Sequence, residues 1–247
     1  MQYGLRALVN GRCEVRRYIA FANTDSDETV PFVLYVWLIT GGERPILVDT
    51  GPKDVAAFNA ATSSYIPGGI VQAPGEATPE LLAGVGVDPA DVSHVFITHL
   101  HPDHYEYFDL FPNAVMVVNG RGFREALPGI RPNVMQALAA RWPDCLHLAG
   151  DEEVLPGIRT VWLGCHSPCS QGIVVNTAAG RVVLCGDVAY LFENIERSVP
   201  IGWADEAEWH AAMARARAAG DVLLPGHDPL LVERYPGGLI APEGGRK

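Results

Sequence analysis

Residues 99–104 read His-Leu-His-Pro-Asp-His, so three imidazoles and one carboxylate fall within six consecutive positions. Imidazole nitrogen together with carboxylate oxygen is the donor mixture that a zinc-like divalent ion prefers. Packing four such groups together without a metal would be costly, because each of them loses its hydration. Within one loop, His99 and His101 can face one ion while Asp103 and His104 turn to another. The segment therefore predicts a site for two divalent metal ions.

Three more donors follow predicted strands further along the chain. His166 lies in Gly-Cys-His-Ser, Asp187 in Gly-Asp and His227 in Pro-Gly-His-Asp. Loops at strand ends can converge on one site. His166 and His227 would each give one ion a third ligand, and Asp187 would bridge the pair through its two oxygens. The predicted metal ligands are His99, His101, Asp103, His104, His166, Asp187 and His227.

Two features near these donors have two readings each. Asp49, in Asp-Thr-Gly, would accept a hydrogen bond from a ligand imidazole and so fix its ring. The same residue could equally serve only to form a turn. Cys165 and Cys169 lie on either side of His166, and Cys185 lies two residues before Asp187, so a thiolate ligand is conceivable. The His and Asp residues already complete two sites, however, and buried free cysteines are common.

Composition restricts the class of partner. The formal charge is −11, from 18 basic and 29 acidic side chains, and no run of Lys or Arg offsets it. Such a charge would repel a phosphate backbone, which speaks against nucleic acid. The longest apolar stretch, residues 31–39, is far shorter than the ~20 residues of a membrane span, and no basic segment leads into an apolar one. We expect a cytoplasmic protein with reduced cysteines.

Strand and helix signals alternate along the chain. Alternating or β-branched runs predict strands over residues 3–9, 12–21, 32–40, 45–48, 92–98, 114–118, 160–163, 172–177 and 181–184. Asn10-Gly11 and Gly41-Gly42 are typical of turns between strands. Capping residues and composition predict helices over residues 78–86, 121–127, 133–141 and 204–219, whereas residues 54–77 show only weak periodicity.

No linker or low-complexity block divides the chain, so we predict one domain over residues 1–247. Strands followed by helices occur twice, and the two halves can share one core as layers of helix, sheet, sheet and helix. The predicted fold class is therefore α+β, a four-layer αββα sandwich.

These motifs together resemble the metallo-β-lactamase superfamily, whose members share an αββα sandwich and bind one or two metals at the edge of its sheets. The resemblance runs from Asp49 through His227. It implies the ligand set given above. The acidic Asp187 speaks against the true β-lactamases, which generally lack it, and His101 speaks against the diiron flavoproteins, which have Glu in the first cluster.

Within the superfamily, the sequence resembles the N-acyl-homoserine lactonases, which quench bacterial signalling. Asp187-Val-Ala-Tyr190 is similar to their bridging Asp followed by a Tyr that contacts the substrate carbonyl. The chain departs from this group at residues 105–108, where Tyr-Glu-Tyr-Phe replaces the usual small, glycine-rich residues. Their bulk and charge could reshape the pocket mouth and favour a different lactone.

The resemblance implies hydrolysis of a lactone ring. A water shared by two divalent ions would have its pKa lowered toward ~7 and attack the carbonyl as hydroxide. The ions are expected to be zinc, with iron, cobalt and manganese as alternatives. Tyr190 would donate a hydrogen bond to the developing oxyanion, and Asp103 or an ion would assist the departing alkoxide. Apolar residues near the motifs give the expected substrate pocket: Tyr65, Ile66, Phe108, Leu191, Phe192 and Trp203.

Other activities stay open at this point. A thioester or phosphoester hydrolase could use the same hydroxide, and an enzyme like the persulfide dioxygenases could hold a single iron in a related ligand set. A non-catalytic protein could also keep the fold. The expected partner is a small-molecule lactone or ester, without nucleic acid or membrane. The sequence leaves monomer and homodimer equally open.

Overall fold

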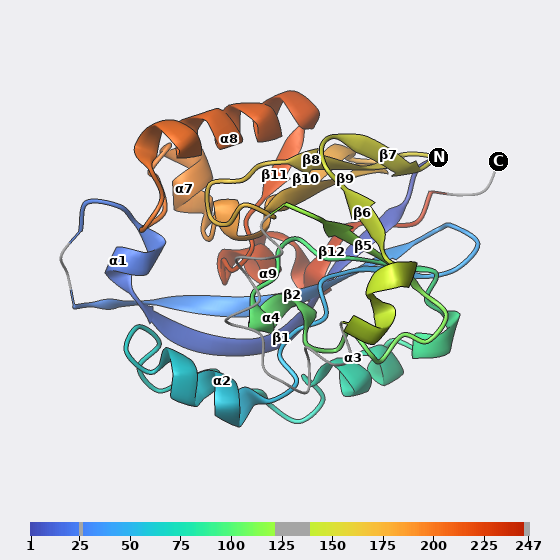
Figure 1. Ribbon diagram of the computed structural model, residues 1–247, viewed down its shortest axis with the longest axis horizontal. Helices are drawn as coiled ribbons and strands as arrows, with labels where there is room; N and C mark the ends of the chain where they lie inside the picture. Colours follow the sequence, from blue (N-terminus) through green and yellow to red (C-terminus); the bar gives the residue numbers. More distant parts are fainter. Residues whose placement is uncertain (25–26, 122–138, 245–247) are drawn as a thin grey trace.

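The computed structural model describes residues 1–24, 27–121 and 139–244. In these residues the strands form two sheets that face each other, with helices on both outer faces (Figure 1). The first sheet has seven strands in the order β12-β1-β2-β3-β4-β5-β6, and the second has five in the order β11-β10-β9-β8-β7, counted over the described part of the chain. The predicted four-layer αββα sandwich is confirmed.

The strands are β1 (Gly4–Arg16), β2 (Thr29–Thr40), β3 (Ile46–Val48), β4 (His94–Phe96), β5 (Val115–Asn119), β6 (Leu146–Leu148), β7 (Glu152–Leu155), β8 (Ile158–Trp162), β9 (Gln171–Thr177), β10 (Gly180–Leu184), β11 (Val222–Leu224) and β12 (Leu239–Ala241). The α-helices are α1 (Arg17–Ala20), α2 (Val55–Thr62), α3 (Thr78–Gly84), α4 (Pro102–Tyr105), α7 (Phe192–Glu196), α8 (Glu206–Ala219) and α9 (Leu230–Arg234). Short 3₁₀ helices are η1 (Pro89–Asp91), η3 (Trp142–Asp144), η4 (Gly186–Val188) and η5 (Pro236–Gly238).

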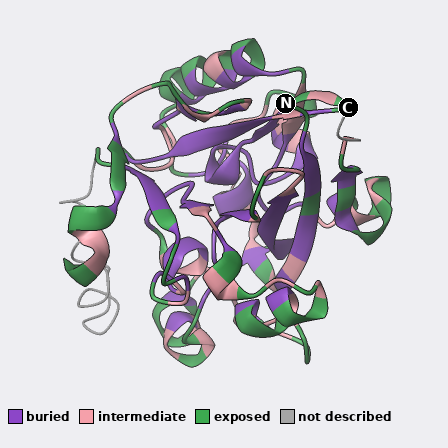
Figure 2. Cartoon of the chain, turned by 90° about the vertical axis from the view of Figure 1, so that its right-hand side faces the viewer, coloured by how far each residue is buried: buried purple, intermediate pink, exposed green. Residues whose placement is uncertain are grey.

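Side chains of the second sheet alternate between two cores, because successive residues of a strand point to opposite faces. Ile173 and Val175 of β9 pack toward the first sheet, in a cluster that includes Trp37 of β2. Val174, between them, packs on the other face in the cluster that contains Trp209 of α8. Figure 2 shows the resulting pattern, with buried strands at the centre and exposed residues on the outer helices.

The outer helices are held by local signals that the sequence carries. Asp205 caps α8, since its carboxylate accepts a hydrogen bond from the amide of Glu208 at 3.0 Å. On the opposite side of the sandwich, α3 has Pro79 in its first turn and inserts the fully buried Leu82 beneath the first sheet. Both helices confirm the sequence prediction over most of their length.

The prediction of a turn at Asn10-Gly11 is wrong. Both residues lie inside β1, which pairs with β2 from Gly4 to Arg16 and contains a bulge between Val9 and Gly11. Asn-Gly is typical of tight turns, but it also suits a bulge, where one extra residue stands without a strand partner. The side chain of Asn10 donates hydrogen bonds to the carbonyl of Glu76 and the hydroxyl of Thr78, so the bulge anchors a distant loop.

Other boundaries also differ from the prediction. The expected strand over residues 12–21 ends at Arg16, and α1 follows it. Helix α2 lies in the stretch with weak periodicity, where Phe58 and Thr62 are its buried residues. Most residues of the helices predicted over residues 121–127 and 133–141 lie outside the described residues, and only residue 121 and the helical residues 139–141 are described. Among the described helices, none combines the length and apolar character needed to cross a membrane.

Candidate metal centre

The predicted donors stand on loops that meet at one edge of the sandwich. His99 and His101 follow β4 of the first sheet, and helix α4 carries Asp103 and His104 directly after them. The second sheet supplies the others: His166 lies in the loop between β8 and β9, Asp187 in η4 after β10, and His227 after β11. The structure therefore brings all seven predicted ligands together, as the convergence of strand ends predicted.

Close backbone packing fixes these loops against one another. Gly186 has a φ of +53° and lies so near Thr98 that an added Cβ would be 3.0 Å from the Cβ of Thr98. A Cβ on Gly226 would lie 2.9 Å from the carbonyl oxygen of Gly186. Only glycine allows this approach. Gly186 and Gly226 therefore let the loops that carry Asp187 and His227 pack closely against their neighbours.

The donor atoms form two sets. The first consists of His99, His101, His166 and Asp187. Its nitrogens are close together: His101 Nδ1 lies 3.0 Å from His99 Nε2 and 2.9 Å from His166 Nε2. The second set consists of Asp103, His104 and His227. This is the division between two ions that the spacing of residues 99–104 predicted.

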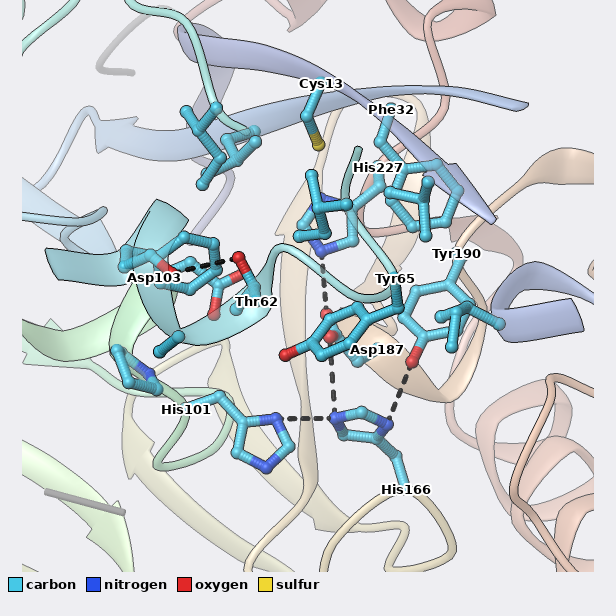
Figure 3. A pocket seen from close by; sticks show the side chains of 18 of the residues that line it. Cys13, Phe32, Thr62, Tyr65, His101, Asp103, His166, Asp187, Tyr190 and His227 are labelled. Carbon is cyan, nitrogen blue, oxygen red and sulfur yellow. Dashed lines mark hydrogen bonds and ion pairs between the residues drawn. The ribbon is translucent and has the colours of Figure 1, made fainter. Parts of the chain in front are cut away.

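Asp187 lies between the two sets and turns one oxygen to each. Its Oδ1 is 3.0 Å from His227 Nε2 and 3.2 Å from His104 Nε2. Its Oδ2 is 3.5 Å from both His99 Nε2 and His166 Nε2. A single carboxylate that faces two donor sets in this way is suited to bridge two cations, and Figure 3 shows it between His166 and His227.

The residues fit divalent metal ions. Nitrogen ligands placed tetrahedrally at 2.0–2.1 Å from zinc are about 3.3 Å apart, close to the separations found between these donors. The Nε2 atom of His104 is buried and makes no well-aligned hydrogen bond to a described residue. It faces two carboxylate oxygens, Asp187 Oδ1 at 3.2 Å and Asp103 Oδ2 at 3.6 Å, and a nitrogen grouped with carboxylate oxygens in this way suits a cation between them. A cation in the second set would complete its coordination.

Burial and neighbouring charges favour the metal-binding forms of His166 and Asp187. Burial lowers the pKa of His166 to about 3, so its imidazole stays neutral, which is the form that binds metals. Burial alone would raise the pKa of Asp187, but the neighbouring His104, His227 and His99 hold it well below its usual value. The carboxylate is therefore ionised and available to two cations. For His104 and His227, burial lowers the pKa, but the Asp187 carboxylate outweighs it and raises the pKa of both, so a cation would have to displace a proton there.

Hydrogen bonds at the Nδ1 atoms of His104 and His227 orient these two rings. Asp49 Oδ2 lies 2.8 Å from His104 Nδ1, and the same carboxylate accepts hydrogen bonds from the amide and hydroxyl of Thr98 at 2.7 and 2.8 Å. His227 Nδ1 is 3.1 Å from the carbonyl oxygen of Val33. A proton on each Nδ1 leaves the Nε2 lone pair for a metal. Sequence reasoning missed Val33, because a backbone carbonyl 194 residues away has no sequence signal.

A cavity of about 310 Å³ opens beside the donors. One side, here called the donor wall, consists of His101, Asp103, His166, Asp187 and His227. The other side, here called the apolar wall, comes from α1, α2, the segment after α2 and strands β1 and β2, and it consists of Val15, Ile19, Phe32, Leu34, Phe58, Ile66 and Ile70. Phe32 joins the two walls, since its ring stacks on that of His227 with centroids 5.2 Å apart.

Tyr190 lies between the walls with its hydroxyl 3.2 Å from His166 Nδ1 (Figure 3). Burial raises its pKa well above the usual value, so the hydroxyl keeps its proton at neutral pH. Of the predicted substrate-pocket residues, Tyr65, Ile66 and Trp203 line the cavity.

The other three do not line it. Phe108 is fully buried in the core cluster beneath the first sheet, together with Tyr105, because residues three apart on a helical turn share its inward face. Glu106 is also buried and accepts hydrogen bonds from the amides of Lys53 and Asp54. None of residues 105–108 lines the cavity, so the structure does not support the possibility that they reshape its mouth. Tyr105, Glu106 and Phe108 instead pack beneath the loop.

Leu191 and Phe192 stand at the start of α7, on the far side of Tyr190. The amide of Phe192 donates to the buried carboxylate of Asp228 at 2.6 Å, and the guanidinium of Arg234 lies 3.8 Å from its ring centroid. Both residues line a separate surface pocket.

The geometry does not support a thiolate as a metal ligand. In the described residues neither donor set includes a thiol, and burial raises the pKa of Cys165 and Cys185 to about 12.

The fold and the donor arrangement define a class of protein. The family model of the metallo-beta-lactamase superfamily matches residues 30–227, so the chain belongs to this superfamily. Asp49 and the seven candidate ligands all lie within that match, which confirms the family predicted from the sequence motifs.

Curated relatives within the superfamily include N-acyl homoserine lactonases. The enzyme AiiA of Bacillus thuringiensis subsp. kurstaki is 28% identical over 200 residues, which cover 79% of this chain and 79% of the relative. The enzyme AttM of Azorhizobium caulinodans is 27% identical over 232 residues, which cover 83% of this chain and 84% of the relative.

A solved structure supports the same grouping. A variant of Bacillus thuringiensis AiiA with N-decanoyl-L-homoserine at its active site superimposes with a TM-score of 0.80 and 25% identity, and the match covers 95% of this chain and 97% of that one. The match covers nearly the whole length of both chains, so that structure shares the overall fold of this chain.

Proposed function

We propose that the protein is a dinuclear metal-dependent hydrolase that opens a lactone ring, with N-acyl-homoserine lactones as the first candidates. The observation that carries the proposal is the pair of donor sets with Asp187 between them, at the side of a cavity whose opposite wall is apolar. The relatives named as N-acyl homoserine lactonases support the choice of substrate. Such an activity would quench bacterial signalling.

We infer a place for each ion from the two donor sets. His99, His101 and His166 would hold one, Asp103, His104 and His227 the other, and Asp187 would contact both. Nitrogen and oxygen donors at these separations favour zinc. Two bound divalent ions would supply an activated water and polarise the lactone carbonyl. The two separate donor sets also favour this reading over a single-iron oxygenase.

Tyr190 is the residue proposed to act on the carbonyl oxygen. His166 turns its Nε2 to the donor set, so its Nδ1 would carry the ring proton. The Nδ1–H group would then donate a hydrogen bond to the hydroxyl oxygen of Tyr190. The hydroxyl proton of Tyr190 is then free to point into the cavity. A hydrogen bond from it to the carbonyl oxygen would strengthen as negative charge develops there.

Asp103 is placed to assist the leaving group. Its side chain lies on the donor wall, and its Oδ2 is 3.6 Å from His104 Nε2. Ring opening forms a bond between water oxygen and carbonyl carbon and breaks the bond from that carbon to the ring oxygen. The ring oxygen then needs a proton, which Asp103 would deliver after receiving it from the attacking water. The product is an acyl hydroxy acid.

The test is hydrolysis of a panel of esters by zinc-loaded protein, with a chelator-treated sample in parallel. The panel contains N-butanoyl-, N-hexanoyl- and N-decanoyl-homoserine lactones, a plain γ-lactone, an aromatic lactone, a thioester and a phosphodiester. We expect turnover of the acyl-homoserine lactones that is lost on chelation and restored by zinc. Turnover of the thioester or phosphodiester alone would overturn the proposal.

A further inference from the structure

Cys169 links two ligand-bearing segments through its sulfur. The amide of Leu100, which lies between His99 and His101, donates a hydrogen bond to Cys169 Sγ at 3.4 Å. Leu100 and Cys169 are both buried, so water does not reach this contact from the surface. The thiol therefore connects the loop between β8 and β9, which carries His166, to the loop that follows β4.

The residues that follow His166 form a turn around this thiol. Ser167 places its Oγ 3.3 Å from Cys169 Sγ and 2.8 Å from Ser170 Oγ. The amide of Ser170 donates to the carbonyl of Ser167 at 2.9 Å, which closes the turn. Residues 167–170 are here called the thiol turn. They fix the backbone that leaves His166.

The backbone that enters His166 is strained. Cys165 has a φ of +68°, a conformation that a residue with a Cβ rarely adopts. Such a conformation costs free energy and persists where the surrounding structure enforces it. Here the amides of Leu163 and Gly164 both donate to the carbonyl of Ser170, at 3.0 and 2.9 Å. The thiol turn therefore holds both ends of the segment that presents His166.

A row of contacts joins the thiol turn to the end of β4. The amide of Gln171 donates to the carbonyl of Thr98 at 2.9 Å, and its side-chain nitrogen donates to the carbonyl of Ile97 at 2.8 Å. The hydrogen bond from Leu100 to Cys169 continues this row to the residues that carry the imidazoles. The relative position of the two segments is thus set by contacts on both sides of His99.

The spacing of the first donor set depends on this relative position. His101 Nδ1 lies 2.9 Å from His166 Nε2, across the two segments (Figure 3). Removing the sulfur would leave the buried amide of Leu100 without its partner, which is costly, and the segment would shift to find another. Any such shift changes the separation between the imidazoles.

The second donor set is held by other contacts. His104 is oriented by the carboxylate of Asp49, and His227 by the carbonyl of Val33. Neither of these contacts involves the thiol turn. A change at Cys169 should therefore affect the two donor sets unequally.

We propose that Cys169 is a positioning residue for the ion held by the first donor set. Its sulfur keeps the Leu100 amide in place, and His99 and His101 thereby stay at the separation from His166 that one ion requires. This inference deepens the proposed function and rests on its two-metal site.

The first test is a zinc titration of metal-free protein in the presence of a competing chelator, followed by nitrogen NMR of the histidine rings. In Cys169→Ala we expect the zinc concentration that half-saturates the rings of the first donor set to rise about 10–100-fold. The rings of the second set should change little. Cys169→Ser keeps an acceptor on a shorter bond from Cβ and should recover part of the affinity. The matched control is Cys145→Ala, which removes a buried thiol that donates to the carbonyl of Arg141 and should keep both affinities.

An unchanged affinity of the first set in Cys169→Ala would overturn the inference. Equal weakening of both sets would overturn it as well, since that is the result of a purely structural role. If Cys169→Ala does not fold, Ser167→Ala removes the hydroxyl beside the sulfur and gives the same comparison. A loss confined to the first set is again expected.

The second test separates positioning from ligation. A thiolate bound to Co²⁺ gives an intense charge-transfer band in the near ultraviolet, and we expect no such band in the cobalt-loaded parent or in Cys169→Ala. A band that disappears in the variant would make Cys169 a ligand and overturn the inference. Selective weakening of the first set in a protein that opens no lactone ring would support the role of Cys169 and overturn the proposed function. Lactone turnover by the parent, together with parent zinc binding in Cys169→Ala, would overturn the inference alone.

Discussion

The donor wall and the apolar wall face the same cavity, but they are built in different ways. The donor wall gathers polar side chains from four segments at strand ends and holds them by hydrogen bonds and by glycines at close contacts, such as Gly186 and Gly226. The apolar wall uses side chains of β1, β2 and α2 that need only volume and shape. From this contrast we infer that the donor wall would determine the reaction, whereas the apolar wall would determine which substrate undergoes it. Changes to the first should therefore affect catalysis most.

The largest effect is expected for Asp187→Asn. The amide keeps the shape of the side chain but removes the negative charge that faces both donor sets. No carboxylate between the sets would then offset the repulsion between two neighbouring cations. We expect zinc content, measured by mass spectrometry of the metal, to fall, and kcat/KM for lactone hydrolysis to drop by more than about 10³-fold. The control is Asp221→Asn at an exposed ion pair with Arg181, which should keep parent activity. Full activity in Asp187→Asn would show that the carboxylate does not bridge.

Tyr190→Phe should have the next largest effect. Loss of the hydroxyl removes the proposed hydrogen bond to the carbonyl oxygen, and we expect kcat to fall by ~10²–10³-fold while two zinc ions stay bound. Steady-state kinetics alongside metal analysis would separate the two quantities. An unchanged rate and affinity would rule out this role, and a loss of zinc would instead make Tyr190 a support for His166.

Asp49→Asn tests whether the hydrogen bond between Asp49 and His104 Nδ1 orients the His104 ring for metal binding. Asp49 holds the Nδ1 proton of His104 and is itself fixed by Thr98. Weakening that hydrogen bond should lower zinc affinity or activity by about 10–100-fold, as found for residues behind metal ligands. Competition with a zinc-binding dye gives the affinity. Parent affinity would support the alternative reading, in which Asp49 only forms a turn.

Gly226→Ala tests whether close packing positions the loops. The new Cβ would lie 2.9 Å from the carbonyl oxygen of Gly186 and would push the two loops apart. We expect destabilisation of about 1–3 kcal/mol, measured by urea denaturation. Gly84→Ala is the matched control: it meets no atom within 4 Å in α3 and should be neutral or stabilise by up to about 1 kcal/mol. Equal stability of both variants would refute the packing argument.

The two walls also differ in how far the sequence predicts them. His, Asp and Tyr are chemically distinctive, so their order between residues 99 and 227 was enough to place the donor wall. The sequence does not distinguish an apolar residue that packs in the core from one that lines the cavity. Phe108 and Ile66 look alike in the sequence, yet one packs in the core and the other lines the cavity, and the choice depends on how α4 and the segment after α2 are turned.

The same limit applies to the fold. The layers followed from strand and helix signals, but Asn10-Gly11 proved to be a bulge, because the pairing of β1 with β2 overrides the local preference for a turn. Helix α2 was missed since only Phe58 and Thr62 along it are buried, which leaves little periodicity to detect. Tertiary contacts decided both cases.

The most direct test of the account is a stepwise titration of zinc into metal-free protein, with hydrolysis of N-decanoyl-homoserine lactone followed at each step. Two donor sets that share Asp187 predict that activity rises until two zinc ions are bound per chain and then stays constant. A plateau at one ion per chain, or no hydrolysis at any occupancy, would contradict the central claim.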